Sequence, residues 1–188
     1  LVKKNKARNI MIVFLSGSES TGKTELARSL SEIYKVPWIP EFAREYMEKL
    51  DHDYSQEDVE AIAKIQLIQI KKYQEEALVF FDTGLVITKV WFQELYKSVP
   101  EWFSEVYEIM AKGHYLLCYP DLDWISDPVR ENADKRLSLH AKYESEITKL
   151  AAPYAIIKGQ GDSRLQMAVK IFEIWGFNTN NSDHGTRK

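Results

Sequence analysis

Eight consecutive residues, GSESTGKT, have the types and spacing that bind a phosphate group. Glycine at 17 and 22 lets the backbone turn tightly, so that successive N–H groups can point at phosphate oxygens where a helix begins. Lys23 would supply a positive charge to the β- and γ-phosphates, and the Thr24 hydroxyl would bind Mg²⁺. The purely structural alternative is a glycine turn that caps an ordinary helix. The segment predicts a site for ATP and Mg²⁺ formed by Gly17, Ser18, Glu19, Ser20, Thr21, Gly22, Lys23 and Thr24.

A second candidate, Asp82, follows the apolar run Leu78-Val79-Phe80-Phe81. A carboxylate at the end of a buried strand can order the water shell of a bound magnesium ion. The alternative is an aspartate that forms a turn before Thr83 and Gly84. ATPases that activate water commonly carry a glutamate directly after this aspartate. Thr83 stands there instead, which favours phosphoryl transfer to an acceptor over hydrolysis.

Glu41 and Arg44 lie one helical turn apart in PEFAREY, after another short apolar run. They can therefore face the same side above the end of a sheet. In an open parallel sheet the ligand crevice lies at the carboxyl ends of the strands, so Glu41 and Asp82 would both border it. We expect Glu41 to act as base or hydroxyl ligand and Asp82 to serve magnesium, although the opposite assignment is also open. The purely structural alternative is an ion pair between Glu41 and Arg44 on the surface.

The segment DLDWISDPVRENADKR carries three basic residues, Arg130, Lys135 and Arg136. A closing arginine can offset the charge that spreads over the transferred phosphoryl group and can exclude water. We expect Arg130 to act in catalysis and Arg136 to contact the nucleotide, while Trp124 and Asp127 would bind the acceptor. Basic residues on a loop are equally often only solvated.

Aromatic residues gather near these positions in the sequence: Trp38, Phe42, Tyr46, Trp91 and Trp124. Packing in the core or the lid would explain most of them. Aromatic faces beside two carboxylates would suit a cationic ring, whereas a phosphorylated acceptor would need more arginines. This pattern favours a nucleoside with a positively charged base.

Short apolar runs alternate with stretches of helical periodicity, which predicts an α/β fold with a mostly parallel sheet and helices on both faces. The expected strands are 10–15, 36–39, 78–81, 115–119 and 154–157. The expected helical stretches are 26–34, 55–73 with a capping box at Ser55 and Asp58, 86–111 interrupted at Pro100, and 163–175. We expect a basic extension over 1–9, a kinase-like domain over 10–176 with a polar lid at about 121–149, and a disordered tail over 177–188.

The composition limits the possible function classes. With 188 residues and a net charge of -3, the chain is long enough for one domain and has no broad positive field for nucleic acid. The single Cys118 cannot form an internal disulfide, and the four histidines show no metal-ligand spacing. No apolar run approaches the length of a membrane span. We therefore expect a cytoplasmic protein that binds neither nucleic acid nor membrane, with its oligomeric state open.

Five segments together resemble the NadR-type ribosylnicotinamide kinase domain: GSESTGKT, PEFAREY, YSQEDVEAIAKIQ, FFDTG and DWISDPVR. The resemblance runs from about Ile10 to Trp175. It implies a three-layer phosphate-loop NTPase fold with five parallel strands in the order 2-3-1-4-5. It also implies ATP-dependent phosphorylation of the ribose 5′-hydroxyl of nicotinamide riboside. The site residues that it carries over, besides the phosphate loop, are Glu41, Arg44, Asp82, Asp127 and Arg130.

Two local departures from that family fall on the acceptor side. Pro128 follows Asp127 where the family would place glycine, and Thr83-Gly84 replaces a Thr-Asp pair after Asp82. Multifunctional members also carry an adenylyltransferase domain and a helix-turn-helix module, for which we expect no room in this chain. The leading hypothesis is a small-molecule kinase for nicotinamide riboside. The alternatives are a kinase for another nucleoside or small polyol, or a regulatory NTPase without a small-molecule acceptor.

Overall fold

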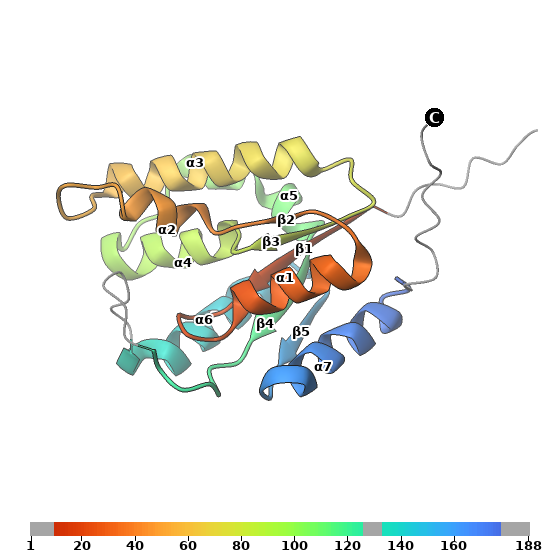
Figure 1. The fold of residues 1–188 in the computed structure, drawn as a ribbon. Helices are drawn as coiled ribbons and strands as arrows, with labels where there is room; N and C mark the ends of the chain where they lie inside the picture. The colour runs from red at the N-terminus through yellow and green to blue at the C-terminus, as the bar shows by residue number, and fades with distance from the viewer. Residues whose placement is uncertain (1–9, 126–132, 178–188) are drawn as a thin grey trace, which may run out of the picture.

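Five parallel strands form the centre of the computed structural model, which describes residues 10–125 and 133–177 (Figure 1). The strands are β1 (Met11–Ser16), β2 (Trp38–Ile39), β3 (Leu78–Asp82), β4 (His114–Cys118) and β5 (Tyr154–Ile157). Their order is β2-β3-β1-β4-β5, and every neighbouring pair is parallel. The predicted α/β class and the strand order 2-3-1-4-5 are confirmed.

Helices cover both faces of this sheet. They are α1 (Lys23–Tyr34), α2 (Phe42–Met47), α3 (Gln56–Tyr73), α4 (Leu85–Tyr96), α5 (Tyr107–Ala111), α6 (Arg136–Lys149) and α7 (Gly161–Ile174), with short 3₁₀ turns η1 (Glu101–Ser104) and η2 (Ala133–Lys135). Residues of α1 and α7 share one core cluster, whereas those of α3, α4 and α6 share the other. Figure 1 shows α1 and α7 in front of the sheet and α6 behind it. The result is three layers.

Strand β1 is buried on both faces, which explains why its sequence is a continuous apolar run. Val13 and Leu15 point toward α1 and α7, and Phe14 points to the opposite face. The Phe14 ring lies 5.4 Å from that of Phe81 and 5.2 Å from that of Tyr115. Packing of this central strand fixes the point at which the phosphate loop begins.

Helix α3 begins at the predicted capping box. The Ser55 hydroxyl accepts a hydrogen bond from the Asp58 backbone N–H, and the Asp58 carboxylate accepts one from the Ser55 backbone N–H. These two bonds satisfy donors that the first turn of a helix leaves without partners. The prediction of this helix start is confirmed.

Residues 121–149 differ from the polar insertion that the sequence predicts. Their second half forms α6, whose residues Leu139, Tyr143 and Ile147 are buried at four-residue spacing. This spacing gives one apolar stripe on an otherwise polar helix, and the stripe packs against α4 and β4. The lid stays a prediction. The predicted interruption of the 86–111 helical stretch at Pro100 is confirmed, since α4 ends at Tyr96 and η1 and α5 follow Pro100.

Several predictions concern residues outside the described ranges, among them the basic extension 1–9, the lid residues Asp127 and Arg130, and the tail beyond Phe177. Phe177 itself, placed in the predicted tail, packs its ring 5.8 Å from that of Tyr34. Among the described residues, no helix is long and apolar enough to cross a membrane.

Candidate active site

The phosphate loop, residues 17–24, connects the end of β1 to the start of α1. Three of its residues have positive φ angles: Gly17 at 146°, Ser20 at 52° and Gly22 at 72°. A Cβ atom added at Gly17 would lie 2.7 Å from the Cys118 carbonyl oxygen, so the loop passes against β4 too closely for a side chain. Gly22 caps α1 in the left-handed conformation. These glycines are required by the path of the backbone, as the motif predicts.

Lys23 and Thr24 occupy the first turn of α1. The Lys23 ammonium donates a hydrogen bond of 3.0 Å to the Ser18 carbonyl and so holds its charge over the loop. The Thr24 hydroxyl donates a 2.5 Å hydrogen bond to Asp82 Oδ2 at the end of β3. The two residues that the sequence assigns to magnesium are thus in direct contact, although 58 positions separate them.

Asp82 is buried, with 2 % of its surface exposed. Desolvation raises the pKa of its carboxyl group, an effect that the Lys23 charge and the Thr24 hydroxyl oppose. Its second oxygen, Oδ1, is buried and has no hydrogen-bond partner among the described residues. A hydroxyl beside a buried carboxylate with a spare oxygen fits Mg²⁺, which prefers oxygen ligands and takes few from the protein in phosphate sites. Residues 10–125 and 133–177 contain no group of three or more His, Cys, Asp or Glu side chains that could hold a metal ion.

Thr83 follows Asp82 in a strained backbone conformation. Its φ angle is 84°, which is rare for a β-branched residue. The Thr83 N–H donates a 3.1 Å hydrogen bond to the Leu15 carbonyl, and this bond holds the turn against β1. Strain of this kind persists where the surrounding structure fixes a functional group. Thr83 turns the chain directly after Asp82, the last residue of β3.

Glu41 caps α2 at the end of β2, but its side chain makes no capping hydrogen bond within the described structure. Desolvation raises the pKa of the Glu41 carboxyl group; the Lys23 charge opposes this rise, and the Asp82 charge adds to it. Glu41 therefore lies within electrostatic reach of both groups. The structure brings the two predicted carboxylates and the loop lysine to one site at the carboxyl ends of the strands.

Two further side chains interact electrostatically with Glu41. Arg44 donates a 3.0 Å hydrogen bond to Glu48 on the exposed side of α2, and its charge lowers the pKa of Glu41. Tyr143 on α6 is buried, which raises its pKa, and the Glu19 and Glu41 charges raise it further. The sequence carries no functional signal for Tyr143. Its position on the apolar stripe of α6 marks it only as a core residue.

The predicted lid begins against the phosphate loop. Arg136, at the start of α6, donates hydrogen bonds to the Ser20 carbonyl at 3.0 Å and the Leu122 carbonyl at 2.8 Å. The Ile125 N–H donates to the Ser20 hydroxyl at 3.3 Å. The Trp124 ring lies beside Arg136, with the guanidinium carbon 6.0 Å from the ring centroid. Arg136 and Trp124 therefore lie together on the loop side of the site.

The remaining aromatic residues do not form one cluster. Phe42 packs on Tyr46 at 5.9 Å between ring centroids, and Trp91 packs on Tyr54 at 5.2 Å. Trp38 belongs to the core beneath α1 and α7. Most of these rings stabilise the helices that carry the acceptor side, as the packing alternative predicts.

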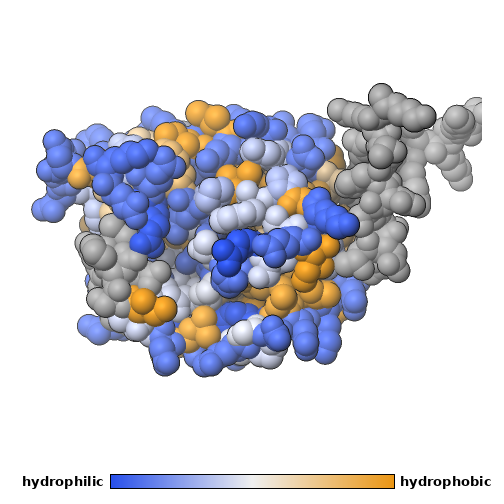
Figure 2. Space-filling model, viewed as in Figure 1, coloured by the Kyte–Doolittle hydropathy of each residue, from blue (hydrophilic) through white to orange (hydrophobic). Residues whose placement is uncertain are grey.

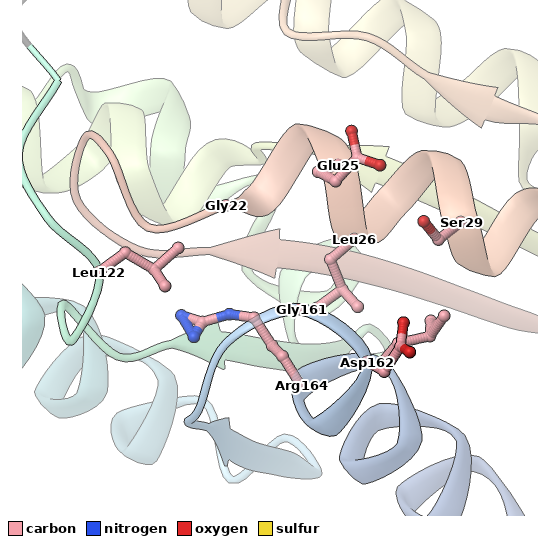
Figure 3. A pocket seen from close by; sticks show the side chains of 9 residues that line it. Gly22, Glu25, Leu26, Ser29, Leu122, Gly161, Asp162 and Arg164 are labelled. Carbon is pink, nitrogen blue, oxygen red and sulfur yellow. The ribbon is translucent and has the colours of Figure 1, made fainter.

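A cavity of about 200 Å³ opens beside the loop, between the first turns of α1 and α7 (Figure 3). It is lined by Gly22, Glu25, Leu26, Ser29, Leu122, Gly161, Asp162, Arg164 and Leu165. Figure 2 shows apolar residues gathered between α1 and α7, with hydrophilic residues around them. Arg164 projects from α7 toward Leu122 (Figure 3) and is only 4 % exposed. Arg164 is not recognisable from the sequence, because one basic residue in an amphipathic helix carries no functional signal.

Comparisons with known proteins agree with this architecture. A family model described as an AAA domain matches residues 12–164. No curated protein sequence matches significantly. Among solved structures, a NadR protein in complex with NR is 24% identical with a TM-score of 0.68, covering 94% of this chain and 54% of that one. NadR in complex with NAD and AMP-PNP is 21% identical with a TM-score of 0.64, covering 90% and 51%.

Smaller kinases share the fold along nearly their whole length. Shikimate kinase from Acinetobacter baumannii is 16% identical with a TM-score of 0.54, covering 94% of this chain and 97% of that one. By contrast, the chain spans about half the length of the two NadR structures. The fold is that of the phosphate-loop kinases.

Proposed function

The chain belongs to the AAA domain family, and from this premise we propose that it is an ATP- and Mg²⁺-dependent kinase for a small nucleoside-like acceptor. In this proposal the phosphate loop binds the triphosphate through its backbone N–H groups and Lys23. Thr24 and Asp82 hold Mg²⁺, which when bound neutralises charge on the phosphate oxygens. Glu41 accepts the proton of the acceptor hydroxyl.

The observation that carries the proposal is the position of Glu41. Glu41 stands at the N-cap of α2, directly after β2, and its desolvated carboxylate responds to the charges of Lys23 and Asp82. A general base must lie near both the phosphate donor and the hydroxyl from which it takes a proton. Desolvation raises the pKa of Glu41 and makes it a stronger proton acceptor than an exposed glutamate. Thr83 occupies the position at which hydrolysing relatives would carry a water-activating glutamate.

We further propose nicotinamide riboside as the acceptor, with transfer to its 5′-hydroxyl. The carboxylates of Glu19, Glu41 and Asp82 act on this site together with the cations Lys23 and Arg44. The Glu41 carboxylate would suit a cationic nicotinamide ring and disfavour a phosphorylated acceptor. The sequence resemblance and the shared fold of NadR in complex with NR support the same acceptor. Arg130 and Asp127 keep their predicted roles within this proposal.

The cavity beside Gly22 would take the base of ATP. It adjoins the loop on the side of α7, whereas Glu41 lies at the end of the edge strand β2. Leu26, Leu122 and Leu165 supply its apolar walls. An apolar slot with a few polar groups is the usual environment of a nucleotide base. The donor and acceptor would then enter from opposite sides of the loop.

The test is incubation of the purified protein with Mg-ATP and separate acceptors: nicotinamide riboside, nicotinic acid riboside, whose carboxylate balances the ring charge, uridine, adenosine and shikimate. We expect ADP release that depends on nicotinamide riboside, with a phosphorylated product identified by mass spectrometry. Preference for a different nucleoside would correct the acceptor and retain the kinase. ADP release that no acceptor changes would favour the regulatory NTPase.

A further inference from the structure

Arg164 makes an extensive set of hydrogen bonds beside the phosphate loop. One terminal nitrogen, Nη1, donates to Asp121 Oδ1 at 3.0 Å and to the Gly159 carbonyl at 2.8 Å. The other, Nη2, donates to the Thr21 carbonyl at 3.0 Å and the Tyr119 carbonyl at 2.8 Å. These acceptors lie in the phosphate loop and in the segments that follow β4 and β5. The guanidinium therefore joins three separate parts of the site.

These contacts use four of the five N–H donors that an arginine has. The fifth, on Nε, is buried and has no hydrogen-bond partner in the described part of the chain. A buried donor of a charged group is costly to leave unpaired, and native proteins rarely do so. The four other bonds hold the guanidinium in place, so this donor cannot rotate away to reach water.

The unpartnered donor lies at the cavity. Arg164 lines it together with Gly22 and Leu122 (Figure 3). From a Cβ position built on Gly22, the nearest Arg164 atom is Nε, at 3.8 Å. A side chain at position 22 would fill this space, and it would also approach Leu122 to 3.0 Å. Because Nε is buried and Leu122 lies this close, a ligand atom would reach Nε only where the Leu122 side chain shifts.

We propose that Arg164 both positions the phosphate loop and recognises the bound nucleotide. Four of its N–H groups hold the loop to the ends of β4 and β5. The fifth donates a hydrogen bond to the nucleoside portion of the nucleotide. The inference rests on the proposed nucleotide-binding function and goes further, since it makes Arg164 a residue that selects a base or sugar. Asp121 orients it, because its other oxygen, Oδ2, accepts a 2.7 Å hydrogen bond from the Gly159 N–H.

Calorimetric titration of the wild-type protein tests this by comparing ATP with tripolyphosphate, which lacks the nucleoside, and with four analogues that each lack one acceptor atom. The ligands are the magnesium complexes of tripolyphosphate, ATP, 1-deaza-ATP, 3-deaza-ATP, 7-deaza-ATP and 2′-deoxy-ATP. We expect one ATP analogue to bind about 10- to 100-fold more weakly than ATP, the range for losing a hydrogen bond to a charged group. If all four analogues bind as tightly as ATP, the proposed hydrogen bond from Arg164 to the nucleoside is wrong. Failure of both ATP and tripolyphosphate to bind would instead refute the proposed function.

The variant Arg164→Lys then links the penalty to this side chain, because lysine keeps the charge but has no Nε–H. In this variant we expect the sensitive analogue to bind within about twofold of ATP, so that its penalty disappears. An equal loss of affinity for every ligand, with the penalty retained, would mean that Arg164 only supports the fold. Arg28→Lys is the matched control, since Arg28 is exposed and pairs with Glu25 on the surface of α1.

Discussion

Among single residues, Lys23 has the most direct role in the proposed reaction. Its ammonium is held 3.0 Å from the Ser18 carbonyl, over the loop that would bind the phosphates. Replacement by alanine removes one preorganised charge from the transition state. We expect Lys23→Ala to lower turnover by about 10²–10³-fold with the fold retained. A coupled assay of ADP release, with circular dichroism to check folding, measures this. Turnover equal to that of the wild type would remove Lys23 from the mechanism.

Glu41 is expected to limit the reaction at low pH. A base acts only when it is deprotonated, and desolvation raises the pKa of this carboxyl group. The rate should therefore increase as the pH rises through that raised pKa. Glu41→Gln should abolish transfer while Mg-ATP still binds in a calorimetric titration. A large loss of ATP affinity would instead assign Glu41 to the nucleotide.

The same residue has a consequence for stability. Because the pKa of Glu41 is raised on folding, the folded state holds this proton more strongly than the unfolded state. Protonated Glu41 therefore adds to the free energy of unfolding. This contribution is fully present below the pKa that Glu41 has in the unfolded chain, and it is lost as the pH rises through its pKa in the folded protein. At neutral pH, Glu41→Gln should therefore raise the melting temperature, a gain in stability at the cost of activity. A lower melting temperature at neutral pH would contradict the raised pKa. Thermal unfolding of both proteins at acidic and neutral pH tests the sign.

Among the elements, the phosphate loop is the least tolerant of substitution. Gly17 has a φ angle of 146° and passes β4 so closely that an added Cβ would meet the Cys118 carbonyl. We expect Gly17→Ala to lose Mg-ATP binding and to lower the free energy of unfolding by about 2 kcal/mol or more. Gly176→Ala is the matched control, because its φ angle is also positive, at 82°, but no atom of the described residues lies within 4 Å of the added Cβ. Chemical denaturation and calorimetry separate the two. Equal losses in both variants would mean that only the backbone angle matters.

Helix α3 supports the acceptor side through its first turn. Ser55 and Asp58 form the capping box, and the Tyr46 hydroxyl of α2 donates a 2.9 Å hydrogen bond to Asp58. Ser55→Ala should therefore lower the free energy of unfolding by about 1 kcal/mol. Ser145→Ala, at an exposed position within α6, should change it by no more than about 0.5 kcal/mol. Urea denaturation of the two variants checks this, and an unaffected Ser55→Ala would show that the cap carries no net stability.

At the level of the whole molecule, periodicity and one motif predict the sheet and the position of the loop. Buried apolar runs are local signals, so β1, β3 and β4 can be recognised along the chain. The contact between Thr24 and Asp82 is also expected, because parallel strands end at the same edge. The Arg164 network has no such signal. It joins residues up to 143 positions apart, and only tertiary packing brings them together.

Helix α6 could not be predicted from its sequence pattern. Polar and charged residues outnumber apolar ones in this helix, so the sequence pattern alone assigns its apolar stripe, Leu139, Tyr143 and Ile147, to a polar lid. Packing against α4 and β4 decides its structure, because most of the stability of a helix in a protein comes from burial of its apolar face. The same packing buries Tyr143 in the core that α6 shares with α4.

The proposed chemistry has one direct test, the fate of the γ-phosphate. A ³¹P NMR time course of the protein with Mg-ATP and nicotinamide riboside follows every phosphorus atom in one sample. We predict that a phosphomonoester signal grows in equal amount to ADP, with inorganic phosphate near its background level. ADP accompanied by an equal amount of inorganic phosphate, whether or not the nucleoside is present, would contradict the kinase assignment.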